Sequence, residues 1–485
     1  MTDRLPAPHP LVVSAQHRAL LLLAGCGSRS WGLAAAVALT LGGAAAGWRQ
    51  PAAPDYLQLA IGHDVLRQAG ASFAAAPPGA LDLRSWLAAL LSLGLHNLAG
   101  ADGLVGLTVL LGSAFGLVLA LSGRRANAHP LALLLGGGLA LAALSQLPAT
   151  TSTYWLALLG ALALLLLGEF RRGQRWAAAA LVGLCLLWAN LESAAVLVPP
   201  GLLLIAAADR LGPGPREARL PWLLAPAAAV AVMVGPLGPG IYSSLPLSLG
   251  QGGEHPLLAL WSSPNFHPWS MRVVELAALL LLGTYLLAGR RLRAGDALVG
   301  LLAAAAALLW SFYLPLLMAV IGIQVPLLLE VAPLPLGRSK PSWAAALALV
   351  LPLLAAGGLA ASALRLGGRA GALVPPPSAV AFLRGAGGVW YSTPELGDYL
   401  AADFPAGRRL MCVTDQMAAG EARMAACHRL SQLTSGTLAL LSSSRVRLAV
   451  LPPANPGVAF LHAEGWRTRY RDQLVVVLTP PRSGL

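Results

Sequence analysis

The chain is 485 residues long, and 57% of its residues are hydrophobic while only 11% are charged. Soluble domains carry about 25% charged residues, so this composition and a mean hydropathy of +0.69 exclude a soluble protein and indicate a polytopic membrane protein. The formal net charge of +13 does not favour nucleic-acid binding, because the arginines stand mainly in short loops between apolar runs, as the positive-inside rule expects.

Residues 1–30 contain only a short apolar run and several arginines. The run LAGC at 23–26 looks like a lipoprotein cleavage box, but only about five apolar residues precede it, too few for a signal peptide. We interpret this match as chance and expect residues 1–30 to be a cytoplasmic N-terminal segment.

Apolar runs of spanning length follow, since a membrane helix needs about 20 apolar residues. We predict a transmembrane domain at 31–370 with about eleven spans, near 31–48, 102–122, 130–148, 152–169, 176–190, 193–208, 220–236, 272–290, 296–311, 313–330 and 342–363. Two long loops interrupt the spans, at 49–101 and 237–271.

The loop charges alternate along these spans. Arginines follow the second, fourth, sixth, eighth and tenth spans, whereas the loops near 149–151 and 191–192 contain no lysine or arginine. Positive charge marks cytoplasmic loops, so we expect a cytoplasmic N-terminus, both long loops outside and, with an odd number of spans, an external C-terminal domain.

The first long loop holds an unusual share of the ionisable residues. They are Arg49, Asp55, His63, Asp64, Arg67, Asp82 and Arg84. Ionisable groups among membrane spans are costly and often functional, although these could equally be solvated charges on an interfacial loop. His63 and Asp64 are adjacent, and adjacent residues point apart on a helix, so we do not expect a His–Asp catalytic pair.

Two further polar sites lie at predicted outer ends of spans. The second long loop contains WSSPNFHPW, in which Asn265 and His267 could bind a ligand or cap the backbone of the loop itself. LLWANLES places Glu192 at the end of the fifth span, either as a solvated loop charge or as an acid of the site.

Residues 375–485 differ in composition and predict a small external α/β domain. VWYS, RRLMCV, VRLAVLPP and DQLVVVL are typical of strands, and SAVAFLRG, PELGDYLAADF and EARMAACHRLSQL are typical of helices. Cys412 and Cys427 fall in this domain, where an oxidising compartment permits a disulfide between them. No nucleotide phosphate loop, nucleophile elbow or cysteine-based metal spacing is present.

Several runs in order along the chain resemble a poorly characterised bacterial branch of the GT-C class of membrane glycosyltransferases. YLQLAIGHDVLRQAG is similar to WWHLATG..IL..G of its first loop, RSWLAALL to HEWL, LLWANLES to LLWANLHGGF, and LWSSPNFH to EWQSPNFH. STPELGDYLAADFPAGRRLMCVTDQ, RVRLAVLPP and WRTRYRDQLVVVL resemble its C-terminal runs. The resemblance implies a mainly α membrane bundle with an extracytoplasmic (periplasmic) α/β domain, in the bacterial plasma membrane.

The resemblance also implies a chemistry: transfer of a sugar from a polyprenyl-phosphate donor to an external acceptor. A first-loop acid, Asp55 or Asp64, would act as the base, and a divalent metal ion often assists in this class. Arginine suits an anionic phosphate, so the expected donor-binding residues include Arg49, Arg67, Arg84 and Arg272, besides His63, Glu192, Asn265 and His267. Partners beyond the lipid-linked donor and the membrane lipids are not indicated.

The chain departs from the pattern of the branch at chemically important positions. Gln58 and Glu192 stand where the branch has histidines, Leu260 stands where it has an acid, and Asp55 falls about one position from its acid. A catalytically degenerate scaffold or accessory subunit of a membrane complex therefore remains the main alternative. A transporter is less favoured because no internal repeat is evident.

Overall fold

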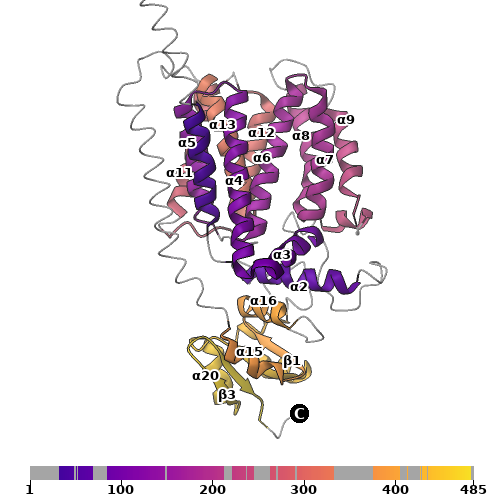
Figure 1. Cartoon of the computed structure of the whole chain (residues 1–485), viewed down its shortest axis with the longest axis vertical. Helices are drawn as coiled ribbons and strands as arrows, with labels where there is room; N and C mark the ends of the chain where they lie inside the picture. The colour runs from indigo at the N-terminus through magenta and orange to yellow at the C-terminus, as the bar shows by residue number, and fades with distance from the viewer. Residues whose placement is uncertain are drawn as a thin grey trace, which may run out of the picture.

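The computed structural model describes residues 32–48, 51, 53–68, 85–147, 150–211, 221–235, 238–244, 263–268, 271–289, 292–331, 375–404, 412, 426–427, 429–433 and 435–481. Helices stand side by side in a bundle, two helices cross one end of it, and a small α/β domain lies beyond them (Figure 1). The two crossing helices, α2 (Ala53–Gln68) and α3 (Trp86–Ala99), come from the predicted first loop.

The bundle is built from apolar helices that coincide with ten of the predicted spans. They are Gly32–Gly47, α4 (Ala101–Arg125), α5 (Pro130–Leu144), α6 (Thr151–Arg171), α7 (Arg175–Leu191), η2 (Ser193–Leu197) continued by α8 (Val198–Leu211), α9 (Pro221–Val232), α11 (Arg272–Ala288), α12 (Ala294–Leu309), and η6 (Ser311–Tyr313) continued by α13 (Leu314–Val331). Within the described ranges, four of these are long and apolar enough to cross a membrane: α4, α6, η2–α8 and η6–α13. The predicted span at 342–363 lies outside the described residues.

Glycines allow the first bundle helix to contact α4 backbone to backbone. A Cβ atom added at Gly43 would lie 2.0 Å from the carbonyl oxygen of Gly112, and one at Gly47 would lie 2.2 Å from that of Thr108. Gly43 and Gly47, and likewise Gly112 and Gly116, are four residues apart, which is the small-residue spacing that lets membrane helices pack closely.

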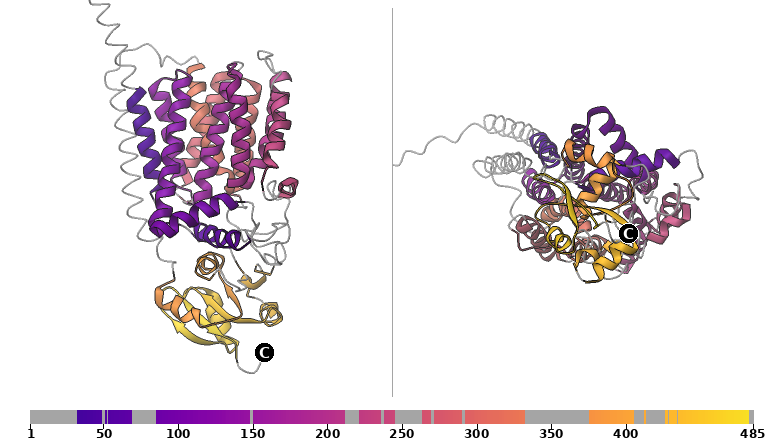
Figure 2. Two further views of the ribbon diagram at one scale, coloured as in Figure 1. Left: turned by 45° about the vertical axis from the view of Figure 1, so that its right-hand side comes forward. Right: turned by 90° about the horizontal axis from the view of Figure 1, so that it is seen from below.

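The arginine-rich loop ends gather at one end of the bundle. Arg171, in the last turn of α6, pairs with Asp209 of α8 and Asp296 of α12, and Arg125 of α4 lies 3.6 Å from Glu169 of α6. Figure 2 shows the C-terminal domain at the opposite end. This arrangement matches the predicted grouping of loops into two sets.

The C-terminal domain contains a four-stranded sheet in the order β1-β2-β4-β3, formed by β1 (Val389–Ser392), β2 (Val446–Leu451), β3 (Arg467–Arg471) and β4 (Val476–Thr479). β1 and β2 are parallel, while β4 is antiparallel to both of its neighbours. Helices α15 (Pro377–Arg384), α16 (Pro394–Asp403), α19 (Ser435–Ser443) and α20 (Pro456–Ala463) complete it.

Sequence patterns predicted only part of this domain. β3 was not predicted as a strand because it lies at the sheet edge and alternates arginine with polar residues, so no buried face reveals it. RRLMCV falls almost entirely outside the described residues. Its Cys412 is bonded to Cys427 with 5.5 Å between the Cα atoms, a separation typical of disulfides.

The hydrophobic core of the C-terminal domain extends into α2. Leu57, Ile61 and Val65 of α2 are buried in one cluster with Leu396 and Leu400 of α16 and with strand residues of the sheet. The first-loop helix is therefore fixed between the bundle and the C-terminal domain.

Candidate functional site

Asp55 connects the first-loop helix to the bundle. It lies in the first turn of α2 and is only 1% exposed. Its Oδ1 accepts hydrogen bonds from the N–H of Thr151 at 2.7 Å and from the Thr151 hydroxyl at 2.8 Å. Thr151 is the first residue of α6, and a carboxylate at a helix N-terminus is favoured by the unpaired N–H groups and the helix dipole. The contact fixes the Asp55 carboxylate at the end of α6.

A second set of hydrogen bonds attaches the start of α3 to the same end of the bundle. The Ser85 hydroxyl donates to Gln58 Oε1 at 3.3 Å, and the Trp86 indole donates to Asn190 Oδ1 at 2.8 Å. The Asn190 amide donates in turn to the carbonyl of Val234, beyond α9. These bonds join α2, α3, α7 and the segment after α9.

Glu192 is buried where α7 ends and η2 begins, between the apolar segments Arg175–Leu191 and Ser193–Leu211. It caps η2, because its carboxylate accepts a hydrogen bond from the N–H of Ala194 at 3.0 Å and one from the Ser193 hydroxyl at 3.4 Å. Burial raises the pKa of Glu192 to about 7, against the lowering effect of these hydrogen bonds. The side chain is thus both a structural cap and an acid that titrates near neutral pH.

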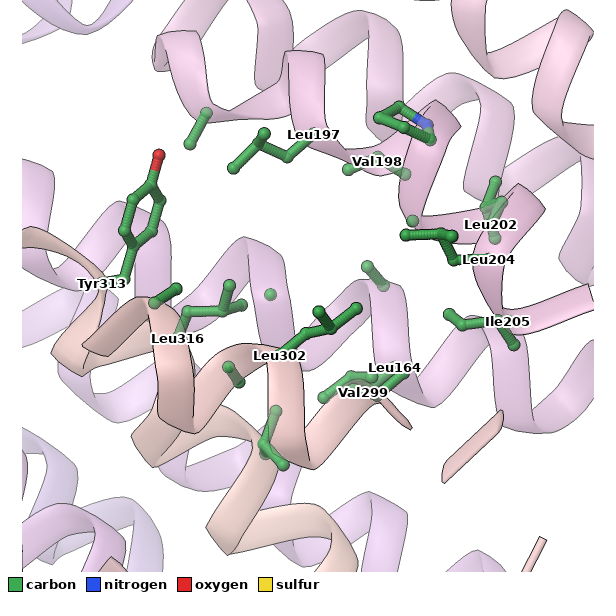
Figure 3. Close-up of a pocket in the computed structure, with 18 of the residues that line it drawn as sticks. Leu164, Leu197, Val198, Leu202, Leu204, Ile205, Val299, Leu302, Tyr313 and Leu316 are labelled. Atoms are coloured by element: carbon green, nitrogen blue, oxygen red, sulfur yellow. The ribbon is translucent and has the colours of Figure 1, made fainter. Parts of the chain in front are cut away.

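An apolar cavity of about 540 Å³ begins beside Glu192, since Ala194 and Leu197 of η2 belong to its wall. Helices α6, α7, α8, α12 and α13 form the rest of the wall, and none of the lining residues is charged. Figure 3 shows Tyr313 and Leu197 at one end of the cavity and Leu164 and Ile205 at the other. Leu156, one of the lining residues, lies five positions after Thr151 on α6, so one helix joins the Asp55 contact to the cavity.

The structure does not bring the remaining predicted residues of the first loop to this place. Arg49 and Arg84 lie outside the described residues, as does the side chain of Arg67. His63 and Asp64 are half-buried farther along α2, where both interact with neighbouring groups. Of the two predicted acids, only Asp55 contacts α6 in the part of the chain that is described.

The second long loop contributes to the bundle end mainly through its backbone and Ser263, whose hydroxyl donates to the carbonyl of Leu308 at 2.8 Å. Asn265 and His267 are exposed, and Asn265 Oδ1 accepts the N–H of His267 at 3.0 Å and lies 2.9 Å from its Nδ1. They therefore follow the alternative in which they cap their own loop. Arg272 is also exposed and is paired with Glu275 at 2.8 Å.

A divalent metal ion finds no ligand set in the described ranges. No three His, Cys, Asp or Glu side chains gather there, and Oδ1 of Asp55 is already bonded to Thr151.

The partner of Asp55 was the main functional residue that sequence reasoning missed. The run PATTST before the fourth span gives a local signal, because threonine is a favoured helix N-cap and Thr150 caps α6 through a 3.1 Å bond from the N–H of Thr153. The sequence does not reveal that the adjacent Thr151 meets Asp55, 96 residues earlier.

By sequence, the chain matches no known protein family and no curated protein. By fold, it is similar to the arabinofuranosyltransferase AftD from Mycobacteria, with 17% identity and a TM-score of 0.49 over 94% of this chain and 40% of AftD. It is also similar to ArnT from Cupriavidus metallidurans, whose structure holds undecaprenyl phosphate, with 13% identity and a TM-score of 0.39 over 93% of this chain and 98% of ArnT. The chain thus spans well under half the length of AftD.

Proposed function

We propose that this chain is a GT-C-type membrane glycosyltransferase that transfers a sugar from a polyprenyl-phosphate donor to an extracytoplasmic acceptor. The observation that supports it most is the position of Asp55, a buried carboxylate on the first-loop helix that is fixed to the N-terminus of α6. The same helix lines the large apolar cavity. A base and a lipid-binding cavity are the two parts that such a transfer needs.

In the proposed reaction, Asp55 accepts the proton of an acceptor hydroxyl while that oxygen bonds to the anomeric carbon of the sugar. The bond between the anomeric carbon and the phosphate oxygen breaks, and the polyprenyl phosphate leaves with the electron pair. A base must lie within about 3 Å of the proton that it accepts. The two hydrogen bonds from Thr151 hold the carboxylate in one orientation, which reduces the cost of ordering it in the transition state.

The apolar cavity is the proposed site of the isoprenoid chain of the donor. Its walls are aliphatic along most of their length, with Trp188, Trp310 and Tyr313 as the only aromatic residues among those that line it. Tyr313 lies at the end near η2 (Figure 3), and aromatic rings with a polar edge favour the interface between apolar chain and headgroup. The phosphate would then lie near Glu192, which can donate a hydrogen bond when it is protonated.

The arginines predicted to bind the phosphate differ in their suitability. Arg272 already pairs with Glu275 and is exposed, so the proposal assigns the phosphate to Arg49, Arg67 or Arg84, which precede, end and follow the first-loop helix in sequence. Arginine forms paired hydrogen bonds with phosphate oxygens.

A catalytically inactive relative is the second candidate. The burial of Asp55 and its bonds to Thr151 are also what a purely structural cap of α6 requires, and the motif departures at Gln58 and Glu192 point the same way. In that case the chain would retain the fold as a scaffold or accessory subunit.

The two candidates are distinguished by incubating the purified full chain in nanodiscs with labelled polyprenyl-phosphate sugars and measuring release of polyprenyl phosphate. For the enzyme we expect turnover that falls at least about a hundredfold in Asp55→Asn, with thermal stability close to that of wild type. Thr151→Val removes one hydrogen bond to the carboxylate but keeps the base, so its turnover should fall much less. Donor binding without turnover in wild type, or full turnover in Asp55→Asn, would contradict the enzyme proposal.

A further inference from the structure

Four arginines gather at one end of the sheet in the C-terminal domain. β2 and β3 are both antiparallel to β4 and so run in the same direction, which places their first residues at the same end of the sheet. Arg445 and Arg447 stand at the start of β2, and Arg467 and Arg469 at the start of β3. We refer to these four residues as the arginine end.

The strand register places the two pairs close to each other. Arg467 is opposite Thr479 of β4, and Ala449 of β2 is opposite Leu478 on the other side of β4. Arg447, two residues before Ala449, therefore lies nearly level with Arg467 across β4, roughly 10 Å away for two inter-strand spacings. The Arg447 side chain lies over Gly388, where an added Cβ would come within 2.6 Å of its Cδ atom.

The positive charge of this end is not neutralised within the described residues. All four arginines are exposed, and none of them forms an ion pair among the pairs found in the described ranges. Charged residues on an edge strand commonly prevent strand-to-strand aggregation. That role fits Arg467 and Arg469 on the edge strand β3, but it does not account for Arg445 and Arg447 on the inner strand β2.

The position of the arginine end in the molecule excludes the surrounding membrane as its ligand. β1 ends at Ser392, and α16, which follows it, packs against α2 at the end of the bundle. β2 and β3 run in the same direction as β1, so their starts point away from the bundle. Figure 1 shows β3 on the side of the domain remote from the bundle helices.

The surface chemistry favours a hydrophilic polyanion over a protein. Phe382 is the only large hydrophobic side chain exposed in the described part of the C-terminal domain, and it is stacked on Tyr470. Protein interfaces require an apolar centre, whereas arginine binds carboxylates and phosphates through paired hydrogen bonds in a hydrated setting. We propose that the arginine end binds an extended polysaccharide that carries carboxylate or phosphate groups. This binding does not depend on whether the chain transfers sugar.

The test measures binding of the full chain, in nanodiscs of neutral lipid, to immobilised polygalacturonate, with neutral dextran of similar length as the comparison. We expect binding to polygalacturonate that weakens as salt is added, because exposed charges are screened, and no binding to dextran. The double variant Arg447→Gln/Arg467→Gln should bind at least about tenfold more weakly, since each charge-assisted hydrogen bond contributes appreciably.

The matched control is Arg429→Gln/Arg471→Gln, which removes two exposed arginines elsewhere on the same domain. Its affinity should stay within about twofold of wild type if binding is local rather than a response to net charge. Arg447→Lys/Arg467→Lys keeps the charge and loses the paired geometry, so it should bind with intermediate affinity. Equal losses in the two glutamine variants, comparable binding of dextran, or tighter binding of a poly-glutamate peptide than of polygalacturonate would each overturn the proposal.

Discussion

The rings of Tyr56 and Tyr399 lie 4.4 Å apart, centroid to centroid, and join the first-loop helix to the C-terminal domain. Tyr56 follows Asp55 directly in the chain. The C-terminal domain therefore contacts the residue beside the candidate base, and its core shares the apolar face of α2. Packing of this domain should consequently influence the position of Asp55.

Replacing Tyr399 by alanine should loosen this contact and destabilise the chain by about 2–4 kcal/mol, because a buried aromatic ring and its ring partner are lost. Tyr399→Phe keeps the ring and is the matched control, with a smaller expected loss. Protease accessibility of the C-terminal domain, measured alongside thermal unfolding in detergent, should rise in the alanine variant. Unchanged accessibility in that variant would show that α16 is held to α2 without the ring pair.

The Glu192 carboxyl should make stability depend on pH. Its pKa is raised to about 7 by burial, whereas an unfolded glutamate titrates near pH 4.3. The folded state therefore binds the proton more tightly, and stability should fall as the pH rises from about 4.5 to about 7, by up to roughly 3 kcal/mol. Glu192→Gln should flatten this part of the curve, which melting temperatures measured from pH 4.5 to 8 will show. An identical slope in wild type and variant would assign the pH dependence to other groups.

Arg171 should be more important for stability than its neighbour Arg172. The Arg171 side chain is 11% exposed and pairs with both Asp209 and Asp296, so its removal leaves two carboxylates close together. We expect Arg171→Gln to cost about 2–4 kcal/mol. Arg172, 40% exposed and paired with Glu169 alone, should cost less than about 1 kcal/mol when changed to Gln. Chemical unfolding of the two variants side by side would measure the difference, and equal losses would contradict the anchoring role of Arg171.

Loss of the Cys412–Cys427 bond should destabilise the C-terminal domain. The bond joins residues 15 positions apart, and closing a loop of that length contributes about 3 kcal/mol in the chain-entropy model. Cys412→Ser/Cys427→Ser should therefore unfold at lower temperature than wild type, and adding a reductant should lower only the wild-type value. Cys185→Ser, at the buried free thiol of the described residues, controls for the effect of removing cysteine. Labelling of both external thiols in unreduced protein would show that the bond does not form.

The topology prediction is tested with reporter fusions. A reporter active only in the cytoplasm should give signal when fused after Arg125 and none when fused after Pro376, because arginine-rich ends are retained inside. Fusion after Arg172 should behave like the first of these. Equal signals at Arg125 and Pro376 would remove the expected external placement of the C-terminal domain.

The sequence by itself determined the class of the protein and most of its helices. Apolar runs and alternating arginines specify spans locally, because each span must satisfy its own backbone hydrogen bonds in lipid, and ten predicted spans have helices in the described residues. It also singled out Asp55 and Glu192, since an ionisable residue beside an apolar run stands out in sequence. It did not predict β3, because an exposed edge strand lacks the alternating apolar face that reveals strands.

Only the tertiary structure decided which of these residues meet. The bond from Thr151 to Asp55 spans 96 residues, and the Tyr56–Tyr399 contact joins opposite ends of the chain. Asn265 and His267 looked equally suited to a ligand or to their own loop, and their mutual hydrogen bonds follow the second arrangement. Such pairings depend on how helices pack around one another, which no local pattern of residues specifies, because a side chain's partners are set by elements distant in sequence.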